Sequence, residues 1–349
     1  MKETDTKKIQ ARIDEIIFDI NKKEVEKGIP EIRISFRQGA CITDSRETKI
    51  SVFQDQARMA MKSRYAETLE CCVFYSDKIA EKIAWERNVD KSFEGSLKNG
   101  DFQLYLQPKV SVEKKKIVGA EALVRWNHPI YGMISPADFI PILENNGKIK
   151  QLDLYMFEKV CEWMQQRKQK GESLYPVSVN LSRNHFINDD FLNPFVTLSK
   201  AYGIDARFLE FEITEGIFAN EAAINRIREG IQKMHSFGFR CSIDDFGVGY
   251  SSLSLIREFD IDSLKLDRSF FVDLTSNKVR DIVGCIAQLA EKLDIQTIVE
   301  GIETKDQIDY LKNIQCDIVQ GYFFSKPLFS DDFEAWESDF EKKADENIY

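Results

Sequence analysis

Short apolar segments with polar ends recur along the second half of the chain. Most are rich in Val and Ile, and helical-looking sequence separates most of them from the next. This alternation predicts the βα repeat of a parallel sheet. The six segments are Val177–Ser182, Leu209–Glu215, Cys241–Asp245, Ser263–Asp267, Thr297–Glu300 and Ile318–Tyr322.

Two further strands are predicted upstream, at Phe102–Gln107 and Ile117–Trp126. Eight strands that mostly alternate with helices favour the α/β class and a closed TIM-like (β/α)8 barrel. The strand count alone does not exclude an open, doubly wound sheet. The clearest helices predicted between the strands are Phe139–Glu144, Gln151–Gln169, Glu221–Phe237 and Ser276–Leu293.

The first 75 residues predict a small α/β module. A module of this length has little core of its own, so we expect it to lean on another part of the protein. Its predicted elements are a helix at Lys8–Lys23, a strand at Glu31–Arg37, a helix at Gln54–Thr68 and a strand at Glu70–Tyr75. The predicted division is this module at 1–75, a connecting helix at 76–91, the barrel at 92–340 and a frayed tail at 341–349.

Charge and composition narrow the classes of function. The 349 residues carry a net charge of −10, which disfavours a nucleic-acid duplex as partner, because phosphate contacts need a basic surface. A small phosphorylated ligand stays compatible with this charge. No apolar run approaches the roughly 18 residues of a membrane span, and the N-terminus has no signal-peptide pattern. The seven cysteines include no CxxC pair, which indicates reduced thiols and a cytoplasmic protein.

Acidic side chains at the strand ends are the main candidates for chemistry. Buried carboxylates are costly unless paired or metal-bound, and in a barrel the carboxyl ends of the strands meet at one mouth. Asp244 and Asp245 are the strongest pair, because at a strand end the second residue can turn back into the mouth. Two neighbouring carboxylates repel each other unless cations lie between them. The alternative for this pair taken alone is an N-capping aspartate before a glycine turn.

Other strands add inward-facing oxygen ligands. Period-2 alternation turns Glu212 towards the barrel interior, Asn180 supplies an amide, and Glu121 shares a strand face with Arg125. Carboxylates with one amide oxygen suit Mg²⁺ or Mn²⁺, and the number of ligands indicates two ions. The alternative is an internal ion-pair network around Arg125 and Lys265, which is disfavoured because the acids outnumber the cations.

Lys265 and Glu300 are the candidates for handling an attacking water. An ammonium at a metal site can hold water or neutralise a phosphoryl oxygen, and pairing of Lys265 with Asp267 on the same strand face is compatible with that role. Glu300 is predicted to be a general base or a metal ligand, with an acid in a turn as the alternative. Glu303 and Gln320 lie next out from the centre.

The three histidines lie far apart, which disfavours a zinc site or a Ser-His-Asp triad. Neither GxxxxGK[ST] nor a strand followed by GxGxxG occurs. These residues predict a metal-dependent hydrolase or lyase with phosphoester chemistry favoured, while proton abstraction beside a carboxylate uses similar parts and stays open.

The segment Glu121–Trp126 (EALVRW) resembles the signature of EAL domains, the bacterial cyclic di-GMP phosphodiesterases. The resemblance spans roughly residues 92–335 and includes further motifs in the same order. They are LQP at 106–108, SP at 135–136 with FIP at 139–141, VNLS at 179–182, EITE at 212–215, DDFGVGYSS at 244–252, KLDRSF at 265–270, VEGIET at 299–304 and QGYFFSKP at 320–327.

The resemblance implies a barrel with an antiparallel first strand that hydrolyses one phosphodiester of cyclic di-GMP to linear pGpG. The implied metal ligands are Glu121, Asn180, Glu212, Asp244 and Asp245. The implied catalytic residues are Glu121, as a ligand, with Lys265 and Glu300, which position or deprotonate the water. The implied substrate contacts are Arg125, at the phosphate, with Gln107, Leu123, Asp267, Glu303 and Gln320. Glu215 would brace the DDFGVGYSS loop, which couples the site to the dimer interface in this family, so a homodimer is implied.

The alternative within the same family is a catalytically silent receptor that binds cyclic di-GMP without cleaving it. Such receptors usually lack a metal ligand or have a broken loop motif, and this sequence has neither change.

The N-terminal module resembles the C-terminal part of a GGDEF (diguanylate cyclase) domain. Ile34–Ala40 stands where that family has a strand with Ser and Gly close together, and Phe53–Lys62 resembles its final helix. The GGDEF motif itself does not occur in the sequence, so cyclase activity is not expected. The module is therefore interpreted as a truncated or degenerate GGDEF domain.

Overall fold

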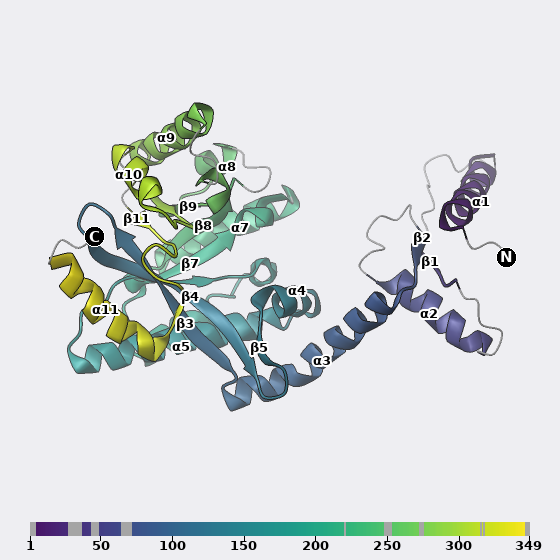
Figure 1. The fold of residues 1–349 in the computed structure, drawn as a ribbon, viewed down its shortest axis with the longest axis horizontal. Helices are drawn as coiled ribbons and strands as arrows, with labels where there is room; N and C mark the ends of the chain where they lie inside the picture. The colour runs from purple at the N-terminus through teal and green to yellow at the C-terminus, as the bar shows by residue number, and fades with distance from the viewer. Residues whose placement is uncertain are drawn as a thin grey trace. The chain divides into compact units, whose positions relative to one another are not determined.

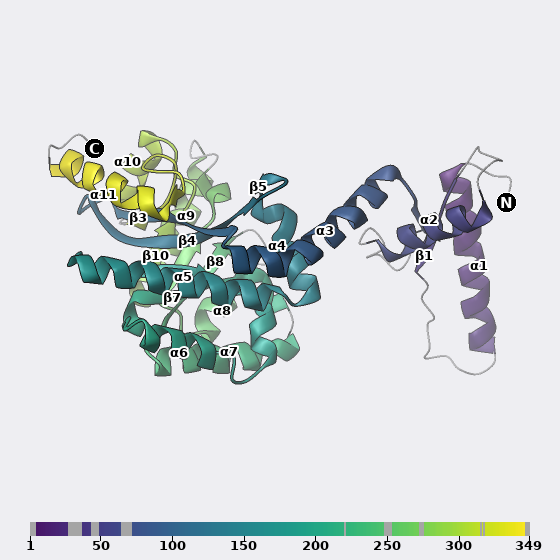
Figure 2. The same ribbon diagram turned by 90° about the horizontal axis from the view of Figure 1, so that it is seen from below.

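The computed structural model describes residues 5–26, 37–42, 49–63, 72–219, 221–247, 253–271, 276–314, 316 and 318–345 (Figures 1 and 2). It divides into two compact units, Met1–Phe93 and Glu94–Tyr349. None of the helices in these described ranges combines the length and the apolarity needed to cross a membrane.

The first unit contains two short parallel strands and their helices. Gly39 in strand β1 (Gln38–Ala40) lies so close to helix α2 (Ile50–Lys62) that a Cβ there would come within 2.1 Å of the Ala57 carbonyl oxygen. Glycine therefore lets the helix pack directly on the strand. Ala60, Val73 and Ile79 form the small buried core. The elements are α1 (Thr6–Glu26), β1 (Gln38–Ala40), α2 (Ile50–Lys62) and β2 (Cys72–Phe74), followed by α3 (Asp77–Asn99).

Predicted and observed element boundaries differ in this unit. Most of the predicted strand Glu31–Arg37 lies outside the described residues, and the observed strand begins at Gln38. The predicted helix Gln54–Thr68 differs at both ends, because α2 begins at Ile50 and ends at Lys62, where Ser63 adopts an extended backbone; residues 64–68 of the prediction lie outside the described residues. The predicted boundary at 91/92 falls within α3, and both the boundary and the GGDEF-like origin of the module stay predictions.

Eight strands of the second unit form a closed barrel, as the sequence predicts. The first strand, β3, pairs with β4 and β11 and is antiparallel to both, while every other neighbouring pair in the ring is parallel. A short turn joins β3 to β4, and such a connection allows only antiparallel pairing. The ring runs β3 (Phe102–Ser111), β4 (Lys116–His128), β6 (Val177–Asn180), β7 (Leu209–Thr214), β8 (Arg240–Phe246), β9 (Ser263–Leu266), β10 (Gln296–Val299) and β11 (Ile318–Val319). The short strands β5 (Gly132–Ile134) and β12 (Leu328–Phe329) pair with β4 and β3.

Helices surround the barrel (Figures 1 and 2). Aromatic side chains pack between these helices and the strands. Phe157 is fully buried, with ring centroids 5.6 Å from Phe211 and 5.0 Å from Phe195. Because successive strand residues point to opposite faces, Phe211 on the helix side leaves Glu210 and Glu212 inside the barrel. The helices are α4 (Pro136–Asn146), α5 (Ile149–Lys170), α6 (Asn193–Ala201), α7 (Glu221–Ser236), α8 (Leu253–Glu258), α9 (Asn277–Lys292), α10 (Lys305–Asn313) and α11 (Ser330–Asp345).

The predicted frayed tail from residue 341 differs from the structure. Helix α11 continues to Asp345, and the i,i+4 ion pair between Lys343 and Asp339 lies within this last part. Such pairs stabilise a helix end, which the acidic composition alone did not indicate.

Candidate active site

The two aspartates at the end of β8 both reach the barrel mouth. Pairing with β9 shifts register between Ile243 and Phe246, and Asp245 adopts a left-handed backbone with φ of 55°. This irregularity turns the second aspartate to the side of the first. Carboxylate oxygens of Asp244, Asp245 and Glu300 consequently lie within 4.8 Å of one another. The expectation that a strand end lets both acids face the mouth is confirmed.

Lys265 lies at the centre of the acidic cluster. Its Nζ atom is 2.7 Å from Glu212, 2.9 Å from Asp244, 3.3 Å from Glu121 and 2.6 Å from Glu300. The lysine side chain is 1% exposed, so these interactions are barely screened by solvent. An ammonium group has three protons to donate, and four carboxylates compete for them.

A second buried lysine, Lys109, was missed by the sequence reasoning. Its Nζ atom donates to Glu212 Oε1 at 2.9 Å and to Ser178 Oγ at 2.8 Å. The predicted strand ended at Gln107, before Pro108, whereas β3 continues to residue 111. The signal was the period-2 alternation itself, because Lys109 shares a strand face with Gln107.

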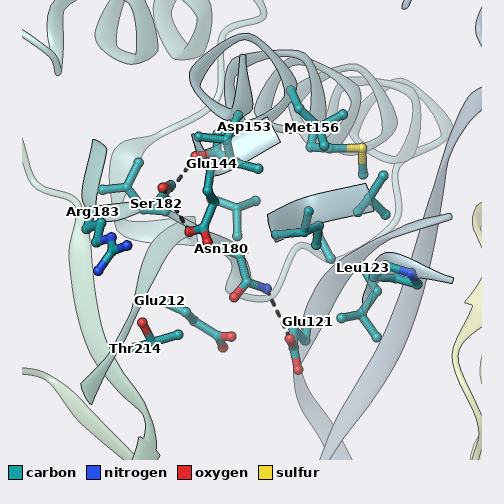
Figure 3. A pocket seen from close by; sticks show the side chains of 18 of the residues that line it. Glu121, Leu123, Glu144, Asp153, Met156, Asn180, Ser182, Arg183, Glu212 and Thr214 are labelled. Carbon is teal, nitrogen blue, oxygen red and sulfur yellow. Dashed lines mark hydrogen bonds between the residues drawn. The ribbon is translucent and has the colours of Figure 1, made fainter. Parts of the chain in front are cut away.

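Glu121 is oriented by amide groups from neighbouring strands. Gln320 donates through Nε2 to Glu121 Oε2 and to Gln107 Oε1, and Gln107 donates to the carbonyl of Ser325. Asn180 Nδ2 lies 3.3 Å from the other oxygen of Glu121 (Figure 3). The Oε1 atom of Gln320 is buried without a hydrogen-bond partner among the described residues, and is therefore an acceptor available to a ligand.

Burial and charge set the pKa values of the site. Burial, followed by repulsion from nearby acids, raises the pKa of Glu300 to about 8, although Lys265 opposes this shift. Burial would also raise the pKa of Glu212, but Lys109 and Lys265 together lower it to about 2. Burial disfavours the charged form of Lys265, yet the surrounding carboxylates hold its pKa well above its ordinary value. Burial also raises the pKa values of Glu121, Asp244 and Asp245.

Two cavities open at the mouth and share Glu121 and Leu123. The smaller has a volume of about 300 Å³, and the larger, about 500 Å³, extends between the strand ends and helices α4 and α5 (Figure 3). The predicted residues lining the smaller cavity are Gln107, Glu121, Leu123, Asp244, Lys265, Asp267, Glu300, Glu303 and Gln320. The predicted residues lining the larger one are Glu121, Leu123, Arg125, Asn180 and Glu212.

The alternative to a metal site was an internal ion-pair network around Arg125 and Lys265. Among the described residues, such a network is present around Lys265 and absent around Arg125. The guanidinium of Arg125 donates to the carbonyl of Val124 and makes no ion pair with the acids among the described residues. The pairing of Lys265 with Asp267 is also not found within the described structure. Asp267 instead accepts a hydrogen bond from the Ser269 amide, because the chain turns immediately after β9.

The loop after β8 is held at its start. Glu215 accepts a hydrogen bond from the Gly247 amide at 3.2 Å. Gly247 has φ of 105°, and a Cβ there would come within 2.0 Å of the Phe270 ring, so only glycine fits. Residues 248–252 of the predicted loop lie outside the described residues.

The donor set fits a divalent cation that prefers oxygen. Three carboxylates converge within 4.8 Å, and burial raises the pKa of each, which is the electrostatic cost that a bound cation removes. Carboxylate ligands without sulfur or imidazole suit Mg²⁺ or Mn²⁺. Glu300, predicted to be a general base or a metal ligand, thus lies close enough to Asp244 and Asp245 to bind the same cation.

The fold and the site together define a TIM-like barrel with an acidic, metal-compatible centre at the carboxyl ends of its strands. A sequence model of the EAL domain matches residues 90–327, and the chain therefore belongs to the EAL domain family.

Curated relatives of this chain are larger proteins. It is 31% identical to the oxygen sensor protein DosP of Escherichia coli, over 76% of this chain and 33% of that protein. It is 32% identical to the cyclic di-GMP phosphodiesterase NbdA of Pseudomonas aeruginosa, over 73% of this chain and 32% of that protein. The chain thus spans about a third of the length of these relatives.

Solved structures of the family share the fold. The PaMucR phosphodiesterase in complex with c-di-GMP has a TM-score of 0.65 and 28% identity, covering 70% of this chain and 99% of that one. The EAL enzyme Bd1971, with cAMP and cyclic di-GMP bound, has a TM-score of 0.66 and 31% identity, covering 74% of this chain and 70% of that one.

Proposed function

We propose that this chain is a metal-dependent phosphodiesterase that hydrolyses one phosphodiester bond of cyclic di-GMP to give linear pGpG. The observation that carries the proposal is the convergence of the acids around Lys265, at a cavity lined by polar groups on or directly after β3, β4, β8, β10 and β11. Membership of the EAL domain family and relatives named as cyclic di-GMP phosphodiesterases support the choice of substrate.

Mg²⁺ or Mn²⁺, two ions per site, would be held by Glu121, Asn180, Glu212, Asp244 and Asp245. When bound, the ions would polarise the phosphoryl oxygen and lower the pKa of a bound water. The raised pKa values of the aspartates support this ligand set, because a nearby cation favours the ionised form that burial alone disfavours.

Lys265 and Glu300 serve the attacking water. Lys265 orients it by hydrogen bonding, and Glu300 accepts its proton as the new bond from water oxygen to phosphorus forms. The raised pKa of Glu300, about 8, gives this carboxylate a basicity suited to such a transfer near neutral pH. The phosphorus–O3′ bond breaks, and the departing O3′ takes a proton from solvent, which leaves the 5′-phosphate on the linear product.

The substrate lies across the two cavities. Arg125 contacts the phosphate, and its guanidinium, free of carboxylate partners in the described structure, supports this role. Gln320 offers its unpartnered Oε1 to a substrate donor. The remaining substrate contacts are Gln107, Leu123, Asp267 and Glu303.

The chain acts as a homodimer in the cytoplasm, and Glu215 links the site to its loop. The bond from the Gly247 amide to Glu215 supports that link, since it fixes the start of the loop that follows Asp244 and Asp245.

The test is to incubate the purified chain with cyclic di-GMP and Mg²⁺ or Mn²⁺ and to separate the products. We expect pGpG to accumulate, to disappear with a chelator, and to fall at least 100-fold in Glu300→Gln. Lys170→Met is the control, because this lysine pairs with Glu334 on the protein surface, away from the site. Binding of cyclic di-GMP without pGpG would favour the silent receptor instead.

A further inference from the structure

Lys109 is a buried cation that the proposed reaction does not use. It extends from β3, the one antiparallel strand of the ring, and is 4% exposed. Its ammonium reaches across the barrel interior to two partners on β6 and β7, Ser178 Oγ at 2.8 Å and Glu212 Oε1 at 2.9 Å. The other inward acid of β7, Glu210, has a donor of its own, Ser263 Oγ at 2.6 Å. The strong hydrogen bond of Lys109 is therefore directed at Glu212 alone.

Glu212 is held from both sides by ammonium groups of different character. Lys109 binds Oε1, whereas Lys265 binds Oε2 at 2.7 Å and also contacts three other carboxylates. Because the charge of Lys265 is shared among four acids, this ammonium is not dedicated to Glu212. Lys109 donates to one acid, Glu212, and one hydroxyl, Ser178. Both of these residues are buried in the barrel interior.

We propose that Lys109 is a positioning residue that fixes the orientation of Glu212 towards the metal site. This inference rests on the proposed function, in which Glu212 is a metal ligand. With Oε1 engaged by Lys109, only Oε2 faces the carboxylate cluster, so the carboxylate meets a cation through one defined oxygen. Without Lys109, Glu212 loses its charged donor on this side and keeps only the neighbouring Ser178 hydroxyl, so the carboxylate can turn both oxygens to Lys265. A cation must then compete with Lys265 for Glu212.

A purely electrostatic role for Lys109 predicts the opposite sign. A positive charge close to the site repels a divalent cation, so its removal would tighten binding. The direction of the change in metal affinity thus separates positioning from simple charge balance.

The experiment measures Mn²⁺ binding to the full chain by titration calorimetry without substrate. We expect Lys109→Met to weaken Mn²⁺ affinity about 10–100-fold, the usual effect of removing a group that orients a metal ligand. Ser178→Ala removes one partner of the ammonium, so it should weaken affinity in the same direction but less. Lys170→Met is the matched control and should leave affinity unchanged, and thermal unfolding of each variant confirms folding.

A double-variant cycle tests whether Lys109 acts through Glu212. In a Glu212→Gln background, Lys109→Met should change Mn²⁺ affinity less than about twofold, because the group that it positions is absent. Equal losses in both backgrounds, or unchanged or tighter binding in Lys109→Met, overturn the inference. If Lys109→Met does not fold, Lys109→Gln in the two backgrounds gives the same comparison. Failure of the wild-type chain to form pGpG would instead refute the proposed function.

Discussion

Replacing Lys265 with methionine should destabilise the protein strongly, because it removes the ammonium shared by three buried acids and the partly buried Glu300. The Nζ atom lies 2.6–3.3 Å from these carboxylates, and at an effective dielectric constant of about 20 each attraction amounts to about 5–6 kcal/mol. Desolvation and repulsion among the acids offset most of this sum. We expect a net loss of about 3–5 kcal/mol in the free energy of unfolding, the cost of leaving buried charges without a partner.

The loss should depend on pH, because the freed carboxyls can take up protons. Burial raises the pKa of Glu300 to about 8 even beside Lys265, and removing the ammonium raises it further. A carboxyl with a higher pKa in the folded than in the unfolded protein binds more protons when folded. The free energy of unfolding therefore falls as pH rises between the two pKa values. The destabilisation should be largest near pH 9 and smaller near pH 6.

Urea unfolding followed by tryptophan fluorescence measures the effect, with Lys170→Met as the control. Mn²⁺ at about 100 times its dissociation constant should raise the free energy of unfolding of the variant by about 2.7 kcal/mol, since the cation neutralises the same acids. An unchanged urea midpoint for Lys265→Met near pH 9 would refute the reasoning. A loss that stays constant down to pH 6 would do the same, because it would show that the acids are not the cause.

Three further predictions concern the loop, the core and the metal. Gly247→Ala should lower the proposed phosphodiesterase activity at least tenfold, because its Cβ would strike the Phe270 ring. Gly284→Ala, where a Cβ has ordinary space in helix α9, should leave that activity unchanged, and equal activities of the two variants would contradict this. Phe157→Ala should lower the free energy of unfolding by about 3–5 kcal/mol in urea, and a loss below about 1 kcal/mol would show that the aromatic cluster collapses around the gap. Mn²⁺ affinity should rise with pH up to about 8, because a cation that enters the acidic cluster favours the ionised forms of Glu300 and the neighbouring ligands. Calorimetry in buffers of different ionisation enthalpy should detect the released protons, and no release at pH 7 would count against this.

The barrel could be predicted because its signals are local. Apolar alternation in β7 separates helix-facing Phe211 from inward-facing Glu212, and this depends only on the two-residue period of a strand. The antiparallel direction of β3 came from the resemblance to EAL domains. Lys109 was missed because a proline commonly ends a strand pattern, although the two-residue alternation that places Lys109 on the same strand face as Gln107 continues past Pro108.

The sequence by itself determined the strands, the identity of the acids and the family, because periodicity and motifs are properties of neighbouring residues. Only the tertiary structure decided which of the acids at the strand ends pair with which lysine. Closure and register of the barrel bring Lys109 and Lys265, from strands far apart in the chain, to the two oxygens of Glu212. The resulting pKa values, low for Glu212 and raised for Glu300, follow from burial and distance, and neither quantity can be read from residue order.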